Sequence, residues 1–268
     1  CSTSLVAQFS FNENGTGIQS SSSTASGLYS TAMGIETTAS GDYSTAMGIS
    51  TTASGFYSTA MGFVTTASGT YSTAMGSVTI ASGYYSTASG RATTAEDYLS
   101  FVIGVHNKTD ETPNPNEFSF ENTAFVIGNG GFINGDFIGT DESRSNAFEV
   151  LFDGTTTIAG DRNINSDVRL KANIISLGAT LSKLLQIDGK TYTMKKDANH
   201  KKKIGLLAQD IEKVFPELVT ETNDIKSVNY QGLVPVLINA MKEQQDEIDT
   251  YKKELDELKT IVKQLISK

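Results

Sequence analysis

A fourteen-residue repeat limits what this chain can fold into more than any other feature does. It runs over residues 27–96, and its first copies read GLYSTAMGIETTAS, GDYSTAMGISTTAS and GFYSTAMGFVTTAS. Each copy has two seven-residue halves, and in each half a glycine follows an alanine by two positions. Glycine at this frequency disfavours a helix, because each one costs about 1 kcal/mol relative to alanine. The pattern therefore predicts short strands separated by glycine turns.

Side chains alternate between the two faces of such a strand. Ser30 and Ala32 face one side, which is small enough for two strands to approach closely. Thr31 and Met33 face the other side, where one methionine per copy stands in register: Met33, Met47, Met61 and Met75. Two-stranded coils stacked at about 4.8 Å make a rod about 24 Å long, which is too thin to bury much surface. We therefore expect the methionine column to face a partner chain.

The repeats resemble the head of YadA-type trimeric autotransporter adhesins, which is built from S-x-A-x-G units. The resemblance covers about residues 20–96 and implies a left-handed parallel β-roll in a surface-displayed homotrimer. This chain carries methionine where those heads often carry isoleucine or valine. The alternative is a flexible Ser/Thr/Gly-rich linker, but linkers do not keep tyrosine and methionine at a fixed phase.

Charge divides the chain near residue 160. Residues 1–160 hold three basic and fourteen acidic residues, whereas residues 161–268 have a net charge of +2. The acidic balance, −9 overall, argues against a general nucleic-acid partner. A single cysteine, Cys1, excludes an intramolecular disulfide framework and a cysteine-built zinc site. No run of about 18 apolar residues predicts a membrane span, and no motif indicates a metal or another cofactor.

Residues 97–160 lose the strict repeat but keep short apolar runs that end in Gly, Asn or Asp. We interpret these runs as strands of a trimeric β stalk, with an independent β-sandwich as the alternative. The spacing of Gly104, Gly128 and Gly139 is irregular and does not establish a solenoid. Residues 111–117 contain two prolines, which predict an exposed loop.

Three blocks follow in a fixed order after residue 160. They read NSDVRLKANI at 165–174, KIGLLAQDIEKVFPELV at 203–219 and VNYQGLVPVLINAMKEQQ at 228–245. Together they resemble the endosialidase-type intramolecular chaperone, a C-terminal domain of phage tail spikes and other trimeric fibres. The resemblance covers about residues 161–250, and its S-D-x-R-L-K start with G-x-x-A-Q-D is highly specific.

The first block also poses a chemical question, because a serine hydroxyl is a poor nucleophile until a base removes its proton. Neither His106 nor His200 lies in a recognisable triad setting. Lys171, five residues after Ser166, can act only as a neutral amine. Moving its pKa from about 10.4 to about 7 requires roughly 4–5 kcal/mol of desolvation or cationic neighbours. Burial at a subunit interface would supply this, with Arg169 adding like-charge pressure.

In the chaperone family, a Ser–Lys dyad cleaves the chain once, after the trimer has folded. The resemblance thus implies that Ser166 is the nucleophile, that Lys171 is the general base, and that the Ser166–Asp167 bond is cut. The residues themselves leave open which backbone carbonyl Ser166 attacks. Some relatives carry a histidine just before the glycine of the second block, where this chain has Lys203 and Ile204. The supporting motif positions are Arg169, Asn173, Gly205 and Gln209.

The rest of this part predicts a helix at about 179–185, a hairpin of 191–194 with 203–208, and a helix at 209–214 that ends before Pro216. A lysine cluster near the hairpin turn is interpreted as solvated rather than as an anion site. Residues stepping by three and four then form an a/d seam, which predicts a coiled coil. A lone amphipathic helix on its own domain is the alternative. The seam residues are Val234, Leu237, Met241, Gln244, Ile248, Tyr251, Leu255, Leu258, Val262 and Leu265.

The predicted fold class is a mainly β fibrous N-terminal part followed by an α+β chaperone domain that ends in a coiled-coil helix. Its predicted regions are a lead-in (1–19), a β-roll head (20–96), a β stalk (97–160), a chaperone (161–233) and a coiled coil (234–268). We predict a trimeric fibre or adhesin tip, on a virion or bacterial surface, that binds a host-surface glycan or protein and whose chaperone releases itself. A receptor-binding protein with a permanent, uncleaved trimerisation domain is the alternative. No paired-carboxylate setting for glycan hydrolysis stands out in residues 1–160.

Overall fold

A computed structural model describes residues 9–12, 15–133, 136–137, 140–195 and 200–267. The chain divides into two compact units, Cys1–Ile164 and Asn165–Lys268. The boundary lies close to residue 160, where the charge pattern changes.

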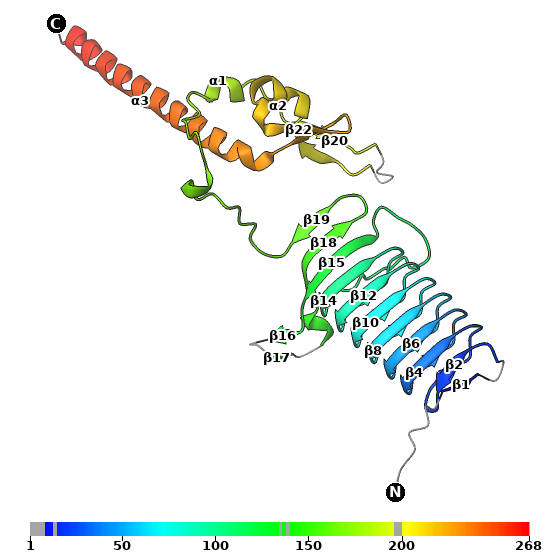
Figure 1. The fold of residues 1–268 in the computed structure, drawn as a ribbon. Helices are drawn as coiled ribbons and strands as arrows, with labels where there is room; N and C mark the ends of the chain where they lie inside the picture. Colours follow the sequence, from blue (N-terminus) through cyan, green and yellow to red (C-terminus); the bar gives the residue numbers. More distant parts are fainter. Residues whose placement is uncertain (1–8, 13–14, 134–135, 138–139, 196–199, 268) are drawn as a thin grey trace. The chain divides into compact units, whose positions relative to one another are not determined.

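The first unit is a parallel β-solenoid of about six turns, as the repeat predicts (Figure 1). Each turn adds one strand to a long sheet and one two-residue strand to a short sheet. The register follows the fourteen-residue period, so Met33 pairs with Met47 and Met47 with Met61. The long-sheet strands of the turns are β4 (Thr31–Ile35), β6 (Thr45–Ile49), β8 (Thr59–Phe63), β10 (Thr73–Ser77), β12 (Thr87–Arg91) and β14 (Phe101–Val105). The short-sheet strands are β3 (Thr24–Ala25), β5 (Thr38–Ala39), β7 (Thr52–Ala53), β9 (Thr66–Ala67), β11 (Ile80–Ala81) and β13 (Thr94–Ala95).

The core of this solenoid is one alanine wide. One alanine from each strand, from Ala25 to Ala95, is at most 1% exposed, and Val102 and Val126 extend the same column. Buried serines and threonines fill the corners. Thr31 and Met33 lie on the opposite face and are half-buried, which confirms the predicted alternation. Because alanine fills the interior, the larger apolar side chains of the turns lie outside.

Successive turns touch through backbone at the glycines of the long sheet. Gly62 has φ +123°, and a Cβ atom on it would lie 2.0 Å from the carbonyl oxygen of Gly76. The same close approach recurs from Gly34 to Gly90. No side chain fits there, so these glycines set how closely the turns stack.

A column of exposed tyrosines lines the turn before the long strands. The rings of Tyr43 and Tyr57 are 4.6 Å apart and those of Tyr57 and Tyr71 are 5.1 Å apart, each pair within 6° of parallel. Each tyrosine of the column has a left-handed φ of 55–59°. That conformation costs a non-glycine residue about 1–2 kcal/mol. Stacking, worth about 0.5–1.5 kcal/mol per pair, offsets much of this cost.

The parallel stacking continues beyond the predicted head. Strand β15 (Thr123–Asn129) pairs with β14 so that Gly128 lies opposite Gly104. The irregular glycine spacing therefore reflects a loop, residues 106–122, inserted into a continuing solenoid. Residues 111–117 lie in this loop and form neither strand nor helix, as predicted. The other elements of this unit are β1 (Phe9–Phe11), β2 (Ile18–Ser20), β16 (Phe132–Ile133), β17 (Asp136–Phe137), η1 (Asp141–Ser143), β18 (Asn146–Leu151) and β19 (Thr156–Ile158).

The second unit is a small α+β structure, as predicted. Two hairpins and two short helices surround a core of Ile211, Phe215, Leu218, Leu233 and Val236. Helices α1 and α2 and the hairpin β20–β21 lie where the sequence predicts them, although residues 197–199 of the expected turn at 197–200 lie outside the described residues. The elements are η2 (Val168–Leu170), α1 (Leu181–Leu184), β20 (Lys190–Tyr192), β21 (Lys203–Gly205), α2 (Ala208–Val214), η3 (Pro216–Leu218), β22 (Val219–Thr222), β23 (Ile225–Val228), η4 (Tyr230–Gly232) and α3 (Leu233–Ile266).

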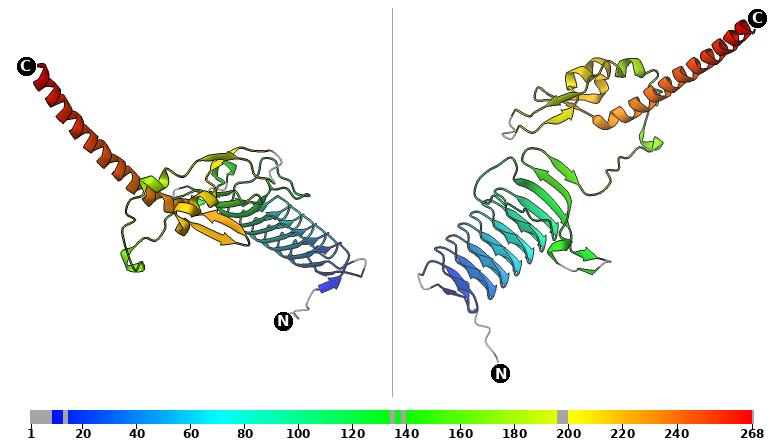
Figure 2. Two further views of the ribbon diagram at one scale, coloured as in Figure 1. Left: turned by 90° about the horizontal axis from the view of Figure 1, so that it is seen from above. Right: turned by 180° about the vertical axis from the view of Figure 1, so that it is seen from behind.

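Helix α3 is 34 residues long and only its beginning packs on its own unit. Leu233, Val236 and Ala240 are buried there. The rest of the helix extends away from the hairpins of the unit (Figure 2). From Met241 onward the apolar residues of the predicted seam are exposed, including Ile248 and Leu255. The packed-helix alternative thus describes only the first three turns, residues 233–243.

Replacing Gly62 by alanine tests the backbone contact between turns. The new Cβ atom would clash with the neighbouring carbonyl and would be strained at φ +123°. We expect Gly62→Ala to destabilise the first unit by about 3 kcal/mol or more. Thermal melting followed by circular dichroism measures this. Gly160→Ala is the control, since a Cβ there meets nothing within 4 Å. Equal melting temperatures for the two variants would contradict the stacking argument.

Candidate functional site

The predicted self-cleavage residues lie in an exposed segment at the start of the second unit. A single 3-10 turn, η2, shapes it, and Asp167 caps this turn by accepting a hydrogen bond from the Arg169 backbone N–H. This turn brings the side chains of residues 166 and 171 to the same place. Lys171 Nζ donates a hydrogen bond to Ser166 Oγ over 2.6 Å. The predicted nucleophile and the predicted base are therefore in direct contact.

Arg169 takes a different position from the one expected. Its guanidinium forms a bidentate pair with Asp167, through Nε to Oδ1 at 2.9 Å and through the terminal nitrogen to Oδ2 at 2.7 Å. The hydrogen bonds from Arg169 lower the pKa of the Asp167 carboxyl and raise the pKa of the Arg169 guanidinium. The charge of Arg169 is thus compensated locally, and the expected like-charge pressure on Lys171 is reduced.

The environment of the dyad is apolar in composition but open to solvent. Ser166 and Lys171 are both exposed. Around them in the segment, Val168, Leu170, Ile174 and Ile175 are 63–88% exposed. A single chain thus supplies the contact between hydroxyl and amine, and the second unit leaves this contact open to solvent.

The supporting motif positions have structural roles of their own. Asn173 adopts a left-handed φ of 53° and turns the chain after the dyad. Gly205 ends strand β21 against Tyr230, whose hydroxyl accepts a hydrogen bond from Leu206 N–H at 2.9 Å. A Cβ on Gly205 would lie 2.8 Å from that hydroxyl oxygen, so a larger residue there would push the Tyr230 side chain aside. Gln209 is exposed in the first turn of α2.

The two histidines play no visible part in this contact. In the first unit, buried His106 donates from Nε2 to the Thr140 carbonyl oxygen at 2.8 Å. His200 follows the hairpin turn in a left-handed conformation. Lys171 is therefore the basic side chain that the described residues place on Ser166.

Both parts of the chain are similar to known protein families. Residues 166–220 match the family model of the chaperone of endosialidase. The YadA head domain repeat matches residues 25–50, 53–78 and 81–104. Both resemblances inferred from the sequence are thus confirmed.

The curated relatives are phage proteins. The long tail fiber protein Gp37 of Salmonella phage S16 is 36% identical over 113 residues, 38% of this chain and 15% of the relative. Its counterpart in Enterobacteria phage Ox2 is 32% identical over 119 residues, 39% of this chain and 47% of the relative. The chain spans less than half the length of these relatives. Over part of its length the chain is therefore similar to phage long tail fibre proteins, and residues 166–220 match the chaperone of endosialidase.

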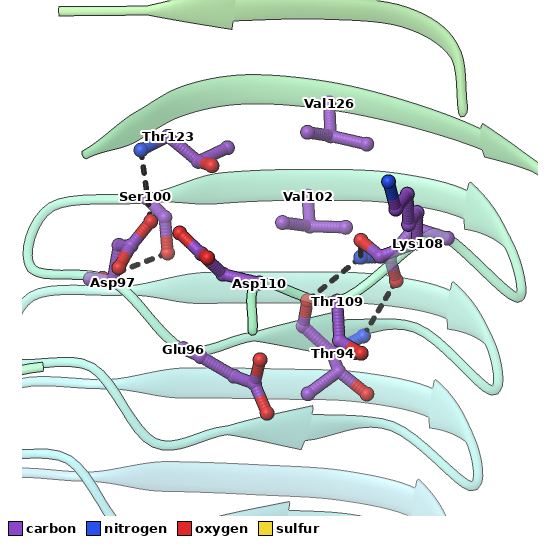
Figure 3. A pocket seen from close by; sticks show the side chains of 11 residues that line it. Thr94, Glu96, Asp97, Ser100, Val102, Lys108, Thr109, Asp110, Thr123 and Val126 are labelled. Carbon is purple, nitrogen blue, oxygen red and sulfur yellow. Dashed lines mark hydrogen bonds between the residues drawn. The ribbon is translucent and has the colours of Figure 1, made fainter. Parts of the chain in front are cut away.

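Elsewhere in the tail fibre-like chain, the end of the regular solenoid holds an acidic cluster that the sequence analysis missed. Glu96, Asp97 and Asp110 line a cavity of about 20 Å³ (Figure 3). Asp97 is buried and accepts backbone hydrogen bonds from Asn114 and Thr123, both at 2.8 Å. The cavity has room for about one water and is far smaller than a site for a sugar ring. The hydrogen bonds of Asp97 therefore hold the inserted loop in place, and the cavity itself is too small to hold a glycan.

A break in the repeat could have pointed to this acidic cluster. Asp97 stands at the position that Gly83 occupies one turn earlier. Asn107, also buried, accepts from Thr94 N–H at 2.8 Å and donates to the Thr94 carbonyl at 3.0 Å, as a neighbouring strand would. The departure from glycine thus marks where the short sheet ends.

Within the part of the chain that the structure describes, no helix is both long and apolar enough to cross a bilayer, and no three potential metal-ligating side chains are grouped so that they could hold an ion.

Glu96 allows a test of the cluster's electrostatics. Burial is the main cause that raises its pKa, and Asp97 and Asp110 add repulsion. A raised folded-state pKa gives stability at low pH that is lost as pH rises through that value. We therefore expect Glu96→Gln to raise the melting temperature at pH 7, with the gain shrinking as pH falls towards about 4. Melting curves across this range, with exposed Glu111→Gln as control, measure it. A constant gain at every pH would contradict this account.

Proposed function

We propose that this chain is part of a phage tail fibre that assembles as a homotrimer through its C-terminal chaperone and then cleaves itself between Ser166 and Asp167. The observation that carries the proposal is the 2.6 Å contact between Lys171 Nζ and Ser166 Oγ within an exposed apolar segment. The match to the chaperone of endosialidase and the similarity to phage long tail fibre proteins support it.

The outer face of the long sheet is the proposed contact between copies of the first unit. Methionines are in register across four turns, and Ile35, Ile49 and Phe63 form an exposed column beside them. At the C-terminal end, Phe101 and Phe125 stack 5.8 Å apart in the same sheet. A sheet with an alanine core on one side and apolar rows on the other needs a cover, and a second and third copy would supply a matching one.

The exposed seam of α3 is the proposed contact between copies of the second unit. An isolated helix of this kind gains little from its own hydrogen bonds, whereas an a/d seam gains apolar burial from partner helices. Helices also associate faster than sheets with contacts between distant residues. The coiled coil would therefore bring three chains together before their solenoids pair.

Assembly would also change the chemistry at the dyad. Packing of Val168, Leu170, Ile174 and Ile175 against partner chains would remove water from around Lys171 and favour its neutral amine. The neutral amine can take the hydroxyl proton of Ser166, whose Oγ would then form an ester with the Ser166 carbonyl carbon of a neighbouring copy, since attack on its own carbonyl would need a four-membered ring. The C–N bond to Asp167 breaks, Lys171 gives the proton to the departing amine, and water then hydrolyses the ester and frees the serine hydroxyl. The net reaction adds one water, so a new carboxylate ends at Ser166 and a new amine begins at Asp167.

Cleavage would make assembly irreversible. Once the chaperone separates, the trimer keeps its contacts but loses the template that formed them. Its persistence then depends on the unfolding barrier and not on equilibrium. Such a fibre fits exposure at a virion surface, where it would bind a host-surface glycan or protein.

Replacing Ser166 by alanine tests the nucleophile. We expect the original chain to give two fragments, residues 1–166 and 167–268, on denaturing gels and in intact mass spectra, whereas Ser166→Ala gives one full-length chain that still assembles. Ser176→Ala is the control, since Ser176 lies in the same exposed segment. An uncut original chain in a stable trimer would favour the permanent trimerisation domain.

A second experiment asks whether cleavage depends on assembly. Ile248→Asp places a charge on the seam, whereas Lys253→Asp changes a residue on the opposite side of α3. We expect the first variant to stay monomeric in native mass spectrometry and uncut, and the second to assemble and cleave normally. Efficient cleavage in a monomeric Ile248→Asp chain would remove assembly from the mechanism.

A further inference from the structure

The chain just after the exposed Ser166–Lys171 segment, called here the cleavage segment, is attached to helix α3. The residues that follow this segment, 178–181, lie against one face of the helix and are held there by three of its residues. Asn239 Nδ2 donates to the Gly178 carbonyl at 3.4 Å. Thr180 Oγ1 donates to the Val236 carbonyl at 2.9 Å, and Thr180 is only 1% exposed. Glu243 makes the remaining contact.

The carboxylate of Glu243 caps the start of helix α1. It accepts hydrogen bonds from the backbone N–H of Thr180 at 2.5 Å and of Leu181 at 3.2 Å. The first N–H groups of a helix have no partner within the helix, so a carboxylate from elsewhere satisfies them well. These hydrogen bonds, with the Thr180 bond first, lower the pKa of Glu243. We name the contact of Glu243 with residues 180–181 the latch.

The latch and the coiled-coil seam occupy different faces of α3. The residues that hold 178–181 are 236, 239 and 243, whereas the neighbouring seam residues are 237, 241 and 244. At 100° per residue, the centres of the two stripes are separated by roughly 100° or more around the helix. The helix can therefore join a coiled coil through one face while holding the cleavage segment with the other.

We propose that Glu243 is a positioning residue for self-cleavage: it couples formation of the assembled helix to placement of the Ser166–Lys171 segment. This inference rests on the proposed function. Glu243 does not touch the reacting atoms. It fixes the chain at Thr180, nine positions after Lys171, so that the exposed segment extends from a set point on α3.

The latch can form only when this part of α3 is helical, so we expect the helix to form before the dyad reacts. Glu243 reaches both N–H groups only when residues 236–243 are helical, because Val236 and Glu243 are spaced by two helical turns. A long, exposed helix is marginal by itself and becomes stable in a coiled coil. Assembly would thus stabilise α3, α3 would hold Thr180, and Thr180 would confine the dyad.

The test follows newly made full-length chain over time. Cell-free synthesis with a short labelling pulse gives the fraction cleaved from denaturing gels, and native mass spectrometry gives the amount of trimer in each sample. The rate is expressed per trimer, so a variant that assembles less does not count as one that cleaves more slowly. The variants are Glu243→Ala, Glu243→Gln and Glu247→Ala, the last lying one turn further along the same helix face.

We expect Glu243→Ala to cleave about ten- to a hundred-fold more slowly per trimer, as for other losses of positioning. Glu243→Gln, which keeps an acceptor oxygen, should restore part of the rate, and Glu247→Ala should match the original chain. A Glu243→Ala trimer that cleaves at the original rate would overturn the latch. Persistence of cleavage in Ser166→Ala would instead overturn the proposed function, so the two failures are distinguishable.

Hydrogen exchange provides a readout independent of cleavage. In the uncut Ser166→Ala background, adding Glu243→Ala should remove protection from the amides of Thr180 and Leu181. Protection in the seam half of α3, residues 248–262, should stay unchanged. Full protection at Thr180 and Leu181 in the double variant would show that Glu243 does not hold them, and would overturn the proposal even if cleavage slowed.

Discussion

A core only one alanine wide is the constraint on which the rest of this molecule depends. Strand stacking at the glycines brings backbone so close to backbone that no methyl group fits between turns. Across each regular turn, the interior holds alanine, serine and threonine, so apolar residues such as Met33, Ile49 and Phe63 lie outside. Such a unit buries too little apolar surface within one chain to resemble an ordinary globular core. Its outer apolar rows are the surface that the proposed assembly would cover.

Much of this was predictable because the repeat fixes register. A fourteen-residue period places each methionine above the next, and alternation decides which side chains face in. The second unit was equally predictable where periodicity or a proline marked the ends of its helices, as for α2 before Pro216. The contact between Ser166 and Lys171 was expected only through resemblance, since a spacing of five residues does not by itself bring two side chains together.

The features that escaped prediction depend on contacts between residues distant in sequence. The irregular spacing between Gly104 and Gly128 concealed a continuing sheet, because the intervening loop is held by buried Asp97 and Asn107. The left-handed tyrosines could not be foreseen either, since the conformation is unfavourable for one residue and acceptable only in a stacked column. Arg169 was expected to add like-charge pressure on Lys171, and its pairing with the Asp167 carboxylate was not foreseen.

If the proposed self-cleavage takes place on this exposed segment, assembly would have to precede it. Ser166 and Lys171 already touch in one chain. In the proposed mechanism, an unassembled chain would still lack the low-dielectric surrounding that favours a neutral amine, and the exposed apolar side chains beside the dyad are suited to be covered by another chain. A dyad buried within its own unit would cut before the solenoids had paired and would release the chaperone too early. In the proposed mechanism, a dyad that partner chains have to bury reacts only when those chains are present. Helix α3 would link assembly to the position of the dyad, because one of its faces meets the partners and another holds Thr180.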